Sequence, residues 1–174
     1  MANCLLTSGR KVPCKSAVGG IKNILFTDYG TLGNATIVAG EITNFSINPD
    51  WFQFEVKGAS SLETAINSSR ENGTTFYEST VTMSLTFQDK ATQEQLKLIT
   101  HARPHVIVED YNGNFFLVGL EHGAEVTGGS ITTGAGMADL SGYSLTIVAQ
   151  ETAPPYFVDS DAISVGSTQI DPTA

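Results

Sequence analysis

Residues 77–87 alternate strictly between two kinds of side chain. One set is mostly apolar and includes the small Ser79 among Tyr77, Val81, Met83, Leu85 and Phe87. The other set is polar: Glu78, Thr80, Thr82, Ser84 and Thr86. Side chains on a strand point to opposite faces with a period of two, so the pattern predicts a long strand with one buried and one solvated face. The solvated face carries hydroxyls and one carboxylate, but no lysine or arginine.

Similar patterns along the chain predict a mainly β fold with one helix. A second alternating strand is expected around Tyr143, Leu145, Ile147 and Ala149, and shorter strands at 21–26, 36–47 and 51–56. Phe52, Phe54 and Val56 are expected to point inward from the last of these. Asn112-Gly113 predicts a hairpin between 105–108 and 115–120. Asp89 is a good N-cap for a helix over about 89–101, which must stop before Pro104. Together these elements predict an antiparallel β-sandwich or barrel with one flanking α-helix.

The length of 174 residues suits one domain. We expect an N-terminal arm over 1–20, a single β domain over 21–157 and an acidic C-terminal tail over 158–174. Residues 57–75 are polar and are predicted to form a long loop, a feature that is usually functional or disordered. This loop is expected to contact other subunits through five residues: Leu62, Glu63, Ile66, Arg70 and Glu71.

Charge is unevenly distributed. Residues 1–27 carry four bases and no acid, whereas the remainder carries five bases and eighteen acids. Two interpretations stay open for the basic arm. It is either a solvated, disordered terminus, or it docks through Arg10, Lys11 and Lys15 onto the acidic body of a neighbouring subunit. Four bases without interleaved aromatics, on a chain with a net charge of −9, argue against nucleic-acid binding.

The sequence offers no convincing catalytic, cofactor or metal site. Cys4 and Cys14 have no nearby histidine, and whether they pair stays open. His101 and His105 are separated by Pro104, and His122 is isolated in the sequence. Glu121 and Glu125 are typical of solvated loop charge. The longest early apolar stretch, at 24–26, is too short for a membrane span. We therefore predict a protein that is not an enzyme and has no cofactor, metal or membrane partner.

The order of elements over residues 36–150 resembles the major tail tube proteins of tailed bacteriophages, which are relatives of the type VI secretion tube protein. The segment Gly-Tyr-Ser-Leu-Thr-Ile-Val-Ala-Gln-Glu at 142–151 is similar to their closing strand. The resemblance implies self-association into stacked hexameric rings, contacts with other tail or connector proteins, and passage of double-stranded DNA without binding. It also implies a place in the virion tail after assembly in the host cytoplasm. The family has no catalytic residues to transfer, and the basic arm and the cysteines lie outside the resemblance.

A tube that conducts DNA should not hold it, and cationic side chains in the channel would bind phosphates. We therefore expect seven residues to face the lumen: Glu78, Thr80, Thr82, Ser84, Thr86, Ser144 and Thr146. Three other assignments stay open, namely a capsid decoration protein, a head–tail connector and a carbohydrate-binding β-sandwich. In the last of these the lone Trp51 would contact sugar, although Phe52 and Phe54 beside it favour core packing.

Overall fold

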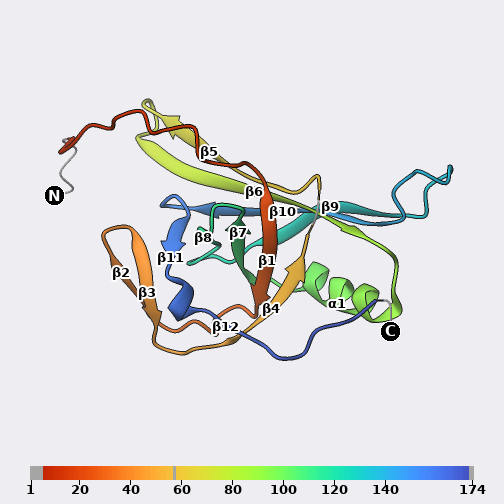
Figure 1. Ribbon diagram of the computed structural model, residues 1–174. Helices are drawn as coiled ribbons and strands as arrows, with labels where there is room; N and C mark the ends of the chain where they lie inside the picture. The colour runs from red at the N-terminus through yellow and green to blue at the C-terminus, as the bar shows by residue number, and fades with distance from the viewer. Residues whose placement is uncertain (1–5, 57, 173–174) are drawn as a thin grey trace.

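The computed structural model describes residues 6–56 and 58–172, which form two β-sheets and one α-helix (Figure 1). The two sheets pack face to face, and the helix lies beside them near one end. This arrangement confirms the predicted fold class, a β-sandwich or barrel with one flanking helix.

The larger sheet contains eight strands. Their order is β12 (Ser164–Val165), β4 (Asp50–Glu55), β1 (Ile21–Thr27), β7 (His105–Asp110), β8 (Phe115–Val118), β11 (Tyr156–Val158), β3 (Glu41–Phe45) and β2 (Ala35–Val38). The β7–β8 hairpin turns at Gly113, whose φ of 81° is easily adopted by glycine, so the predicted Asn112-Gly113 hairpin is confirmed.

Both faces of the larger sheet are buried near its centre. In β1, Ile24 and Phe26 belong to a first core, while Leu25 between them belongs to a second. In β7, Val106 belongs to the first core and its neighbour Ile107 to the second. The sheet curls so that β3, β11 and a 3-10 turn at Ser160–Ala162 cover its second face. This explains the continuous apolar runs in β1 and β7, which are typical of strands covered on both sides.

The smaller sheet contains four antiparallel strands. Their order is β5 (Ser61–Ser69), β6 (Thr74–Thr86), β10 (Gly142–Glu151) and β9 (Glu125–Thr132). Its inner face packs on the larger sheet and completes the first core with Val81, Met83, Leu85, Tyr143, Leu145, Ile147 and Ala149. The inward-facing residues predicted for 143–149 are therefore confirmed, as are Val81, Met83 and Leu85 in β6.

Helix α1 (Lys90–His101) begins and ends as the sequence predicts. The Asp89 carboxylate accepts hydrogen bonds from the backbone N–H groups of Ala91 and Thr92, and the helix stops at Ala102, two residues before Pro104. Leu96 is its buried residue. No helix in the described part of the chain has the length and apolar character needed to cross a membrane.

The prediction of a long loop over 57–75 is wrong for the described residues 61–75. Residues 61–69 form β5, which pairs with β6 through a short turn at 70–73. Leu62 and Thr64 are half-buried on the inner side, but the segment is so rich in Ser, Thr and Asn that its alternation is weak. The turn ends in Asn72-Gly73, where Gly73 has a φ of 64°. This is the same dipeptide that marks the β7–β8 hairpin.

Three further expectations are corrected. Phe87 is 55 % exposed with a φ of 70°, because β6 ends one residue earlier. In the segment 51–56, Phe54 and Val56 pack in the first core as predicted, but Phe52 is 49 % exposed. Trp51, on the other face, is fully buried in the second core. The predicted tail over 158–174 begins inside the folded domain. Val158 and Ala162 are buried, and β12 pairs with β4.

Candidate functional site

The outer face of the smaller sheet gathers all seven residues that the sequence predicts to face a lumen. Directly opposed residues on paired strands lie on the same face. Ser144 lies opposite Ser84, Thr146 opposite Thr82, and Gly142 opposite Thr86. At the other end Gln150 lies opposite Glu78, and its side-chain amide donates a 2.6 Å hydrogen bond to the Glu78 carboxylate. The pairing creates a hydroxyl-rich surface, which we call the polar face.

The flanking strands extend the polar face with residues that sequence reasoning missed. Glu63 of β5 lies opposite Thr80, and Glu125 of β9 lies opposite Val148. Since Thr80 and Val148 are themselves paired, the four residues form one row across the sheet. Ser61 and Ser130 continue the neighbouring rows. The Asn72-Gly73 turn was the one signal that could have paired β5 with β6 and so placed Glu63 on this face.

The polar face is negatively charged. None of the four strands contains a lysine, an arginine or a histidine. Three carboxylates lie on it, those of Glu63, Glu78 and Glu125. Glu78 belongs to the outward-facing set of β6, and the other two lie opposite outward-facing residues of the neighbouring strands. The face can therefore accept hydrogen bonds and repel phosphate, but it has no side chain that would bind a nucleic-acid backbone electrostatically.

The two edges of the smaller sheet are displaced from each other along the strand direction. Strand β5 pairs with residues 74–82 of β6, whereas β9 pairs with residues 142–148 of β10, which lie opposite 80–86 of β6. On its outer side neither edge strand is paired with another described strand. Strand β9 approaches β10 closely, since a Cβ on Gly129 would collide with the Ser144 carbonyl oxygen. Glycine is therefore required there.

Two hairpins project from opposite ends of the smaller sheet (Figure 1). The β5–β6 hairpin extends beyond β10 and exposes Ile66 (68 %) and Phe76 (38 %). The connection between β9 and β10, at 133–141, exposes Met137 fully. In that connection the Asp139 carboxylate accepts hydrogen bonds from the backbone N–H groups of Gly136 and Ala135, which lower its pKa below the usual value. The connection is therefore an ordered loop with apolar residues on its surface.

The residues predicted to contact other subunits lie on different surfaces. Leu62 packs against the first core, Glu63 lies on the polar face and Ile66 is exposed on the projecting hairpin. Arg70 and Glu71 lie in its turn. Whether any of them contacts a subunit stays a prediction.

The described part of the N-terminal arm, residues 6–20, is exposed throughout. It is fixed to the domain at Val18, whose N–H and carbonyl both hydrogen-bond to the Asn112 side chain at 2.8 and 2.7 Å. Arg10, Lys11 and Lys15 precede this attachment. Cys14 is exposed on the arm, and Cys4 lies outside the described residues.

The two histidines near the helix, His101 and His105, differ in their exposure to solvent. His101 is the exposed last residue of α1, whereas His105 begins β7 and is buried. The N–H of Gly30 donates to Nε2 of His105 at 3.1 Å, so Nδ1 carries the proton and donates to the Gly119 carbonyl at 2.6 Å. Burial is the main cause that lowers the pKa of His105. A neutral ring with both nitrogens satisfied is a structural group.

Comparison with known proteins identifies no relative of this chain. No family model matches the chain, and no significant match is found among curated proteins or solved structures. Function is therefore inferred from the polar face, its edges and the projecting hairpins. A sugar-binding role for Trp51 is not supported by its position, because that side chain is fully buried.

Proposed function

We propose that this protein is the subunit of a tail tube, in which copies form rings that stack and conduct double-stranded DNA. The observation that carries the proposal is the polar face of the smaller sheet, which has three carboxylates and no base over four strands. A channel wall of this kind repels the DNA backbone, whereas each cationic side chain would add a phosphate-binding site in every subunit of every ring.

The geometry of the edges supports a ring. Four antiparallel strands place β5 and β9 in opposite directions. The β9 edge of one copy and the β5 edge of the next would therefore pair antiparallel, with all copies related by one rotation. The displacement between the two edges also fits, because a closed barrel requires a stagger between strands. The face that lines the inside of such a barrel is the polar face, since the opposite face is the first core.

Six copies would close a barrel of suitable width. Roughly 24 strands at about 4.8 Å spacing and about 40° tilt give a backbone diameter of roughly 50 Å. Subtracting side chains on both sides leaves a pore with room for duplex DNA. The two projecting hairpins would then lie at the two ends of each ring, where their exposed apolar residues, including Ile66 and Met137, would be covered by the adjacent rings.

A matched pair of triple variants tests the proposal. In the first, Glu78, Thr80 and Thr82 are replaced by lysine on the polar face. In the second, three residues of α1 are replaced by lysine, namely Gln93, Glu94 and Gln95, so that the charge change is the same. Both proteins should fold and assemble, since solvated positions usually change stability within about 0.5 kcal/mol.

Assembled tubes of the polar-face variant should retain duplex DNA in a filter-binding assay. The salt dependence of retention should be steep, with a slope of about 0.9 for each phosphate neutralised. The wild type should not retain DNA, and the α1 variant should retain much less. Equal retention by the two variants would contradict a channel lined by the polar face.

A further inference from the structure

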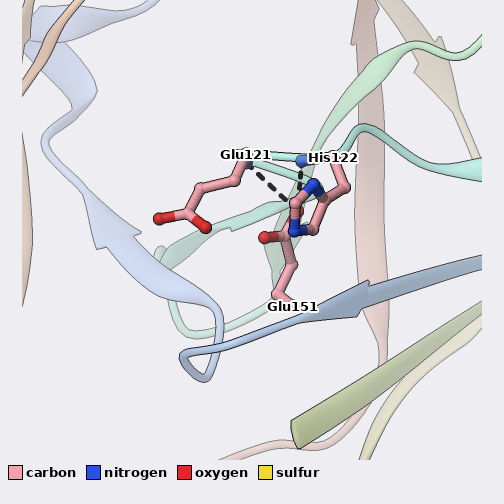
Figure 2. Close-up of side chains that lie close together, drawn as sticks. All are labelled: Glu121, His122 and Glu151. Carbon is pink, nitrogen blue, oxygen red and sulfur yellow. Dashed lines mark hydrogen bonds between the residues drawn. The ribbon is translucent and has the colours of Figure 1, made fainter.

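Three side chains that can ligate a metal converge beside the connection between the two sheets (Figure 2). Glu121 and His122 lie in the loop between β8 and β9, and Glu151 is the last residue of β10. One ligand atom from each residue lies within 4.8 Å of those of the other two. Sequence reasoning considered Glu121 and His122 but missed Glu151, which is about thirty residues away and is brought close by the sheet.

The Glu151 carboxylate is already oriented. One of its oxygens, Oε1, accepts hydrogen bonds from the backbone N–H groups of Glu121 at 3.1 Å and His122 at 2.9 Å, which leaves Oε2 available (Figure 2). The Thr152 hydroxyl donates to the Glu121 carboxylate at 3.4 Å, and the Tyr29 hydroxyl donates to the Glu121 carbonyl at 2.7 Å. Such outer hydrogen bonds are the kind that orient ligands in metal sites.

The two carboxylates lack a cationic partner among the described residues, where the one salt bridge joins Lys22 and Glu109. The nearby guanidinium of Arg103 instead stacks on the Tyr29 ring at 3.9 Å. The two carboxylates are therefore partnered by hydrogen-bond donors, the backbone N–H groups of Glu121 and His122 and the Thr152 hydroxyl, and a bound cation would add the opposite charge.

We propose that Glu121, His122 and Glu151 bind one divalent transition-metal ion of the Zn²⁺ class. An imidazole nitrogen with two carboxylate oxygens suits Zn²⁺, whereas Ca²⁺ and Mg²⁺ prefer oxygen alone. Ligand atoms around tetrahedral Zn²⁺ lie about 3.3 Å apart, so the site must contract on binding. Glu121 and His122 are exposed, and Glu151 is half-buried and held by two backbone N–H groups, so the first two side chains would move toward the third. The fourth position is open to water.

The ion would act as a clamp between the sheets. The loop that carries Glu121 and His122 leaves the larger sheet at β8, and Glu151 ends the strand at the centre of the smaller sheet. The proposal does not depend on the tail-tube assignment. It concerns how the two sheets are held together at this point.

The test is isothermal titration calorimetry of the full chain with ZnCl₂ at neutral pH. Cys4 and Cys14 are replaced by serine in every protein, because thiolates would compete for the ion. Three variants each remove one ligand: Glu121→Gln, His122→Ala and Glu151→Gln. Glu151→Gln retains an amide oxygen that can accept the hydrogen bonds from the backbone N–H groups of Glu121 and His122. It therefore removes the negative charge and the carboxylate ligand but keeps these two hydrogen bonds. His101→Ala, at the exposed end of α1, is the matched control.

The parent and His101→Ala should bind one Zn²⁺ per chain with the same affinity. Each ligand variant should bind Zn²⁺ with an affinity lower by a factor of about ten or more. Loss of a residue that only hydrogen-bonds to a ligand already lowers metal affinity about tenfold. Zn²⁺ should also raise the Tm of the parent and leave that of His122→Ala unchanged, and the metal-free proteins should have matching circular dichroism spectra. Absence of one-to-one binding by the parent, or full affinity in His122→Ala and Glu151→Gln, would overturn the proposal.

Discussion

Strands β1 and β7 of the larger sheet are covered on both faces, whereas β6 and β10 of the smaller sheet are covered on one. In β1 the neighbours Ile24 and Leu25 are 0 % and 1 % exposed, although they point in opposite directions. In β6 the neighbours Met83 and Thr82 are buried and half-exposed. A strand whose outer face is mostly polar and partly exposed to solvent contributes stability mainly through its inner side. Its other side is left for contacts outside the domain.

The largest expected effect is on stability, when neighbouring residues of β1 and of β6 are replaced by alanine. In β1, Ile24→Ala and Leu25→Ala should each lower the free energy of unfolding by about 2–5 kcal/mol, because each leaves a cavity in one of the two cores. In β6, Met83→Ala should cost a similar amount, while Thr82→Ala should stay within about 0.5 kcal/mol. Urea unfolding measures all four. A large loss for Thr82→Ala in the unassembled protein would show that the polar face is buried within the domain.

The difference between the sheets also decides what could be predicted from the sequence. Alternation in 77–86 and 143–149 could be recognised because the inner face is mostly apolar, with the small Ser79 as an exception. Strand β5 escaped prediction because its half-buried Leu62 and Thr64 stand among Ser, Thr and Asn. In β4, Trp51 belongs to the second core and Phe54 packs against the first, so alternation does not tell which aromatic side chain is buried, and Phe52 is exposed.

The candidate site follows the same logic. The residues of β6 and β10 on the polar face could be grouped from periodicity alone. Glu125 could not, because its membership depends on which strands are neighbours and in what register. Glu63 could be placed only by interpreting Asn72-Gly73 as the turn of a hairpin that pairs β5 with β6. The cluster of Glu121, His122 and Glu151 depends on a contact across about thirty residues, for which the local sequence has no signal.

The pH dependence of the unfolding free energy tests how the larger sheet accommodates the buried His105 of β7. His105 is buried with both ring nitrogens hydrogen-bonded, and burial, aided by the Arg103 charge, lowers its pKa in the folded state. As pH falls below about 6.5, the unfolded chain takes up a proton that the folded chain resists. Stability should therefore fall by up to about 1.4 kcal/mol per pH unit until the folded pKa is passed.

Urea unfolding between neutral and mildly acidic pH measures this slope. Asp110 and Asp139 have lowered pKa values, so their contributions are lost only below about pH 4 and do not interfere. In His105→Gln the slope below about pH 6.5 should be reduced. An unchanged slope would assign the pH dependence to other groups.

The smallest expected effect concerns the arm. Replacing Arg10, Lys11 and Lys15 by glutamine keeps the arm length and its attachment at Val18 but removes its charge. If the arm docks on the acidic body of a neighbour, this variant should assemble less well at low salt, and the difference from wild type should shrink as salt screens the contact. Light scattering across a salt series measures it. Indistinguishable assembly at every salt concentration would leave the arm as a solvated terminus.

The most direct test of the central claim is a high-resolution electron microscopy map of the assembled particle. We predict rings in which β9 of one subunit pairs with β5 of the next. We also predict that four hydroxyl side chains point into a central pore wide enough for duplex DNA, with three carboxylates on the same wall. The hydroxyls are those of Thr80, Thr82, Ser144 and Thr146, and the carboxylates are those of Glu63, Glu78 and Glu125. A map in which this face is buried against a neighbouring subunit, or in which the particle has no pore, would contradict the tail-tube assignment.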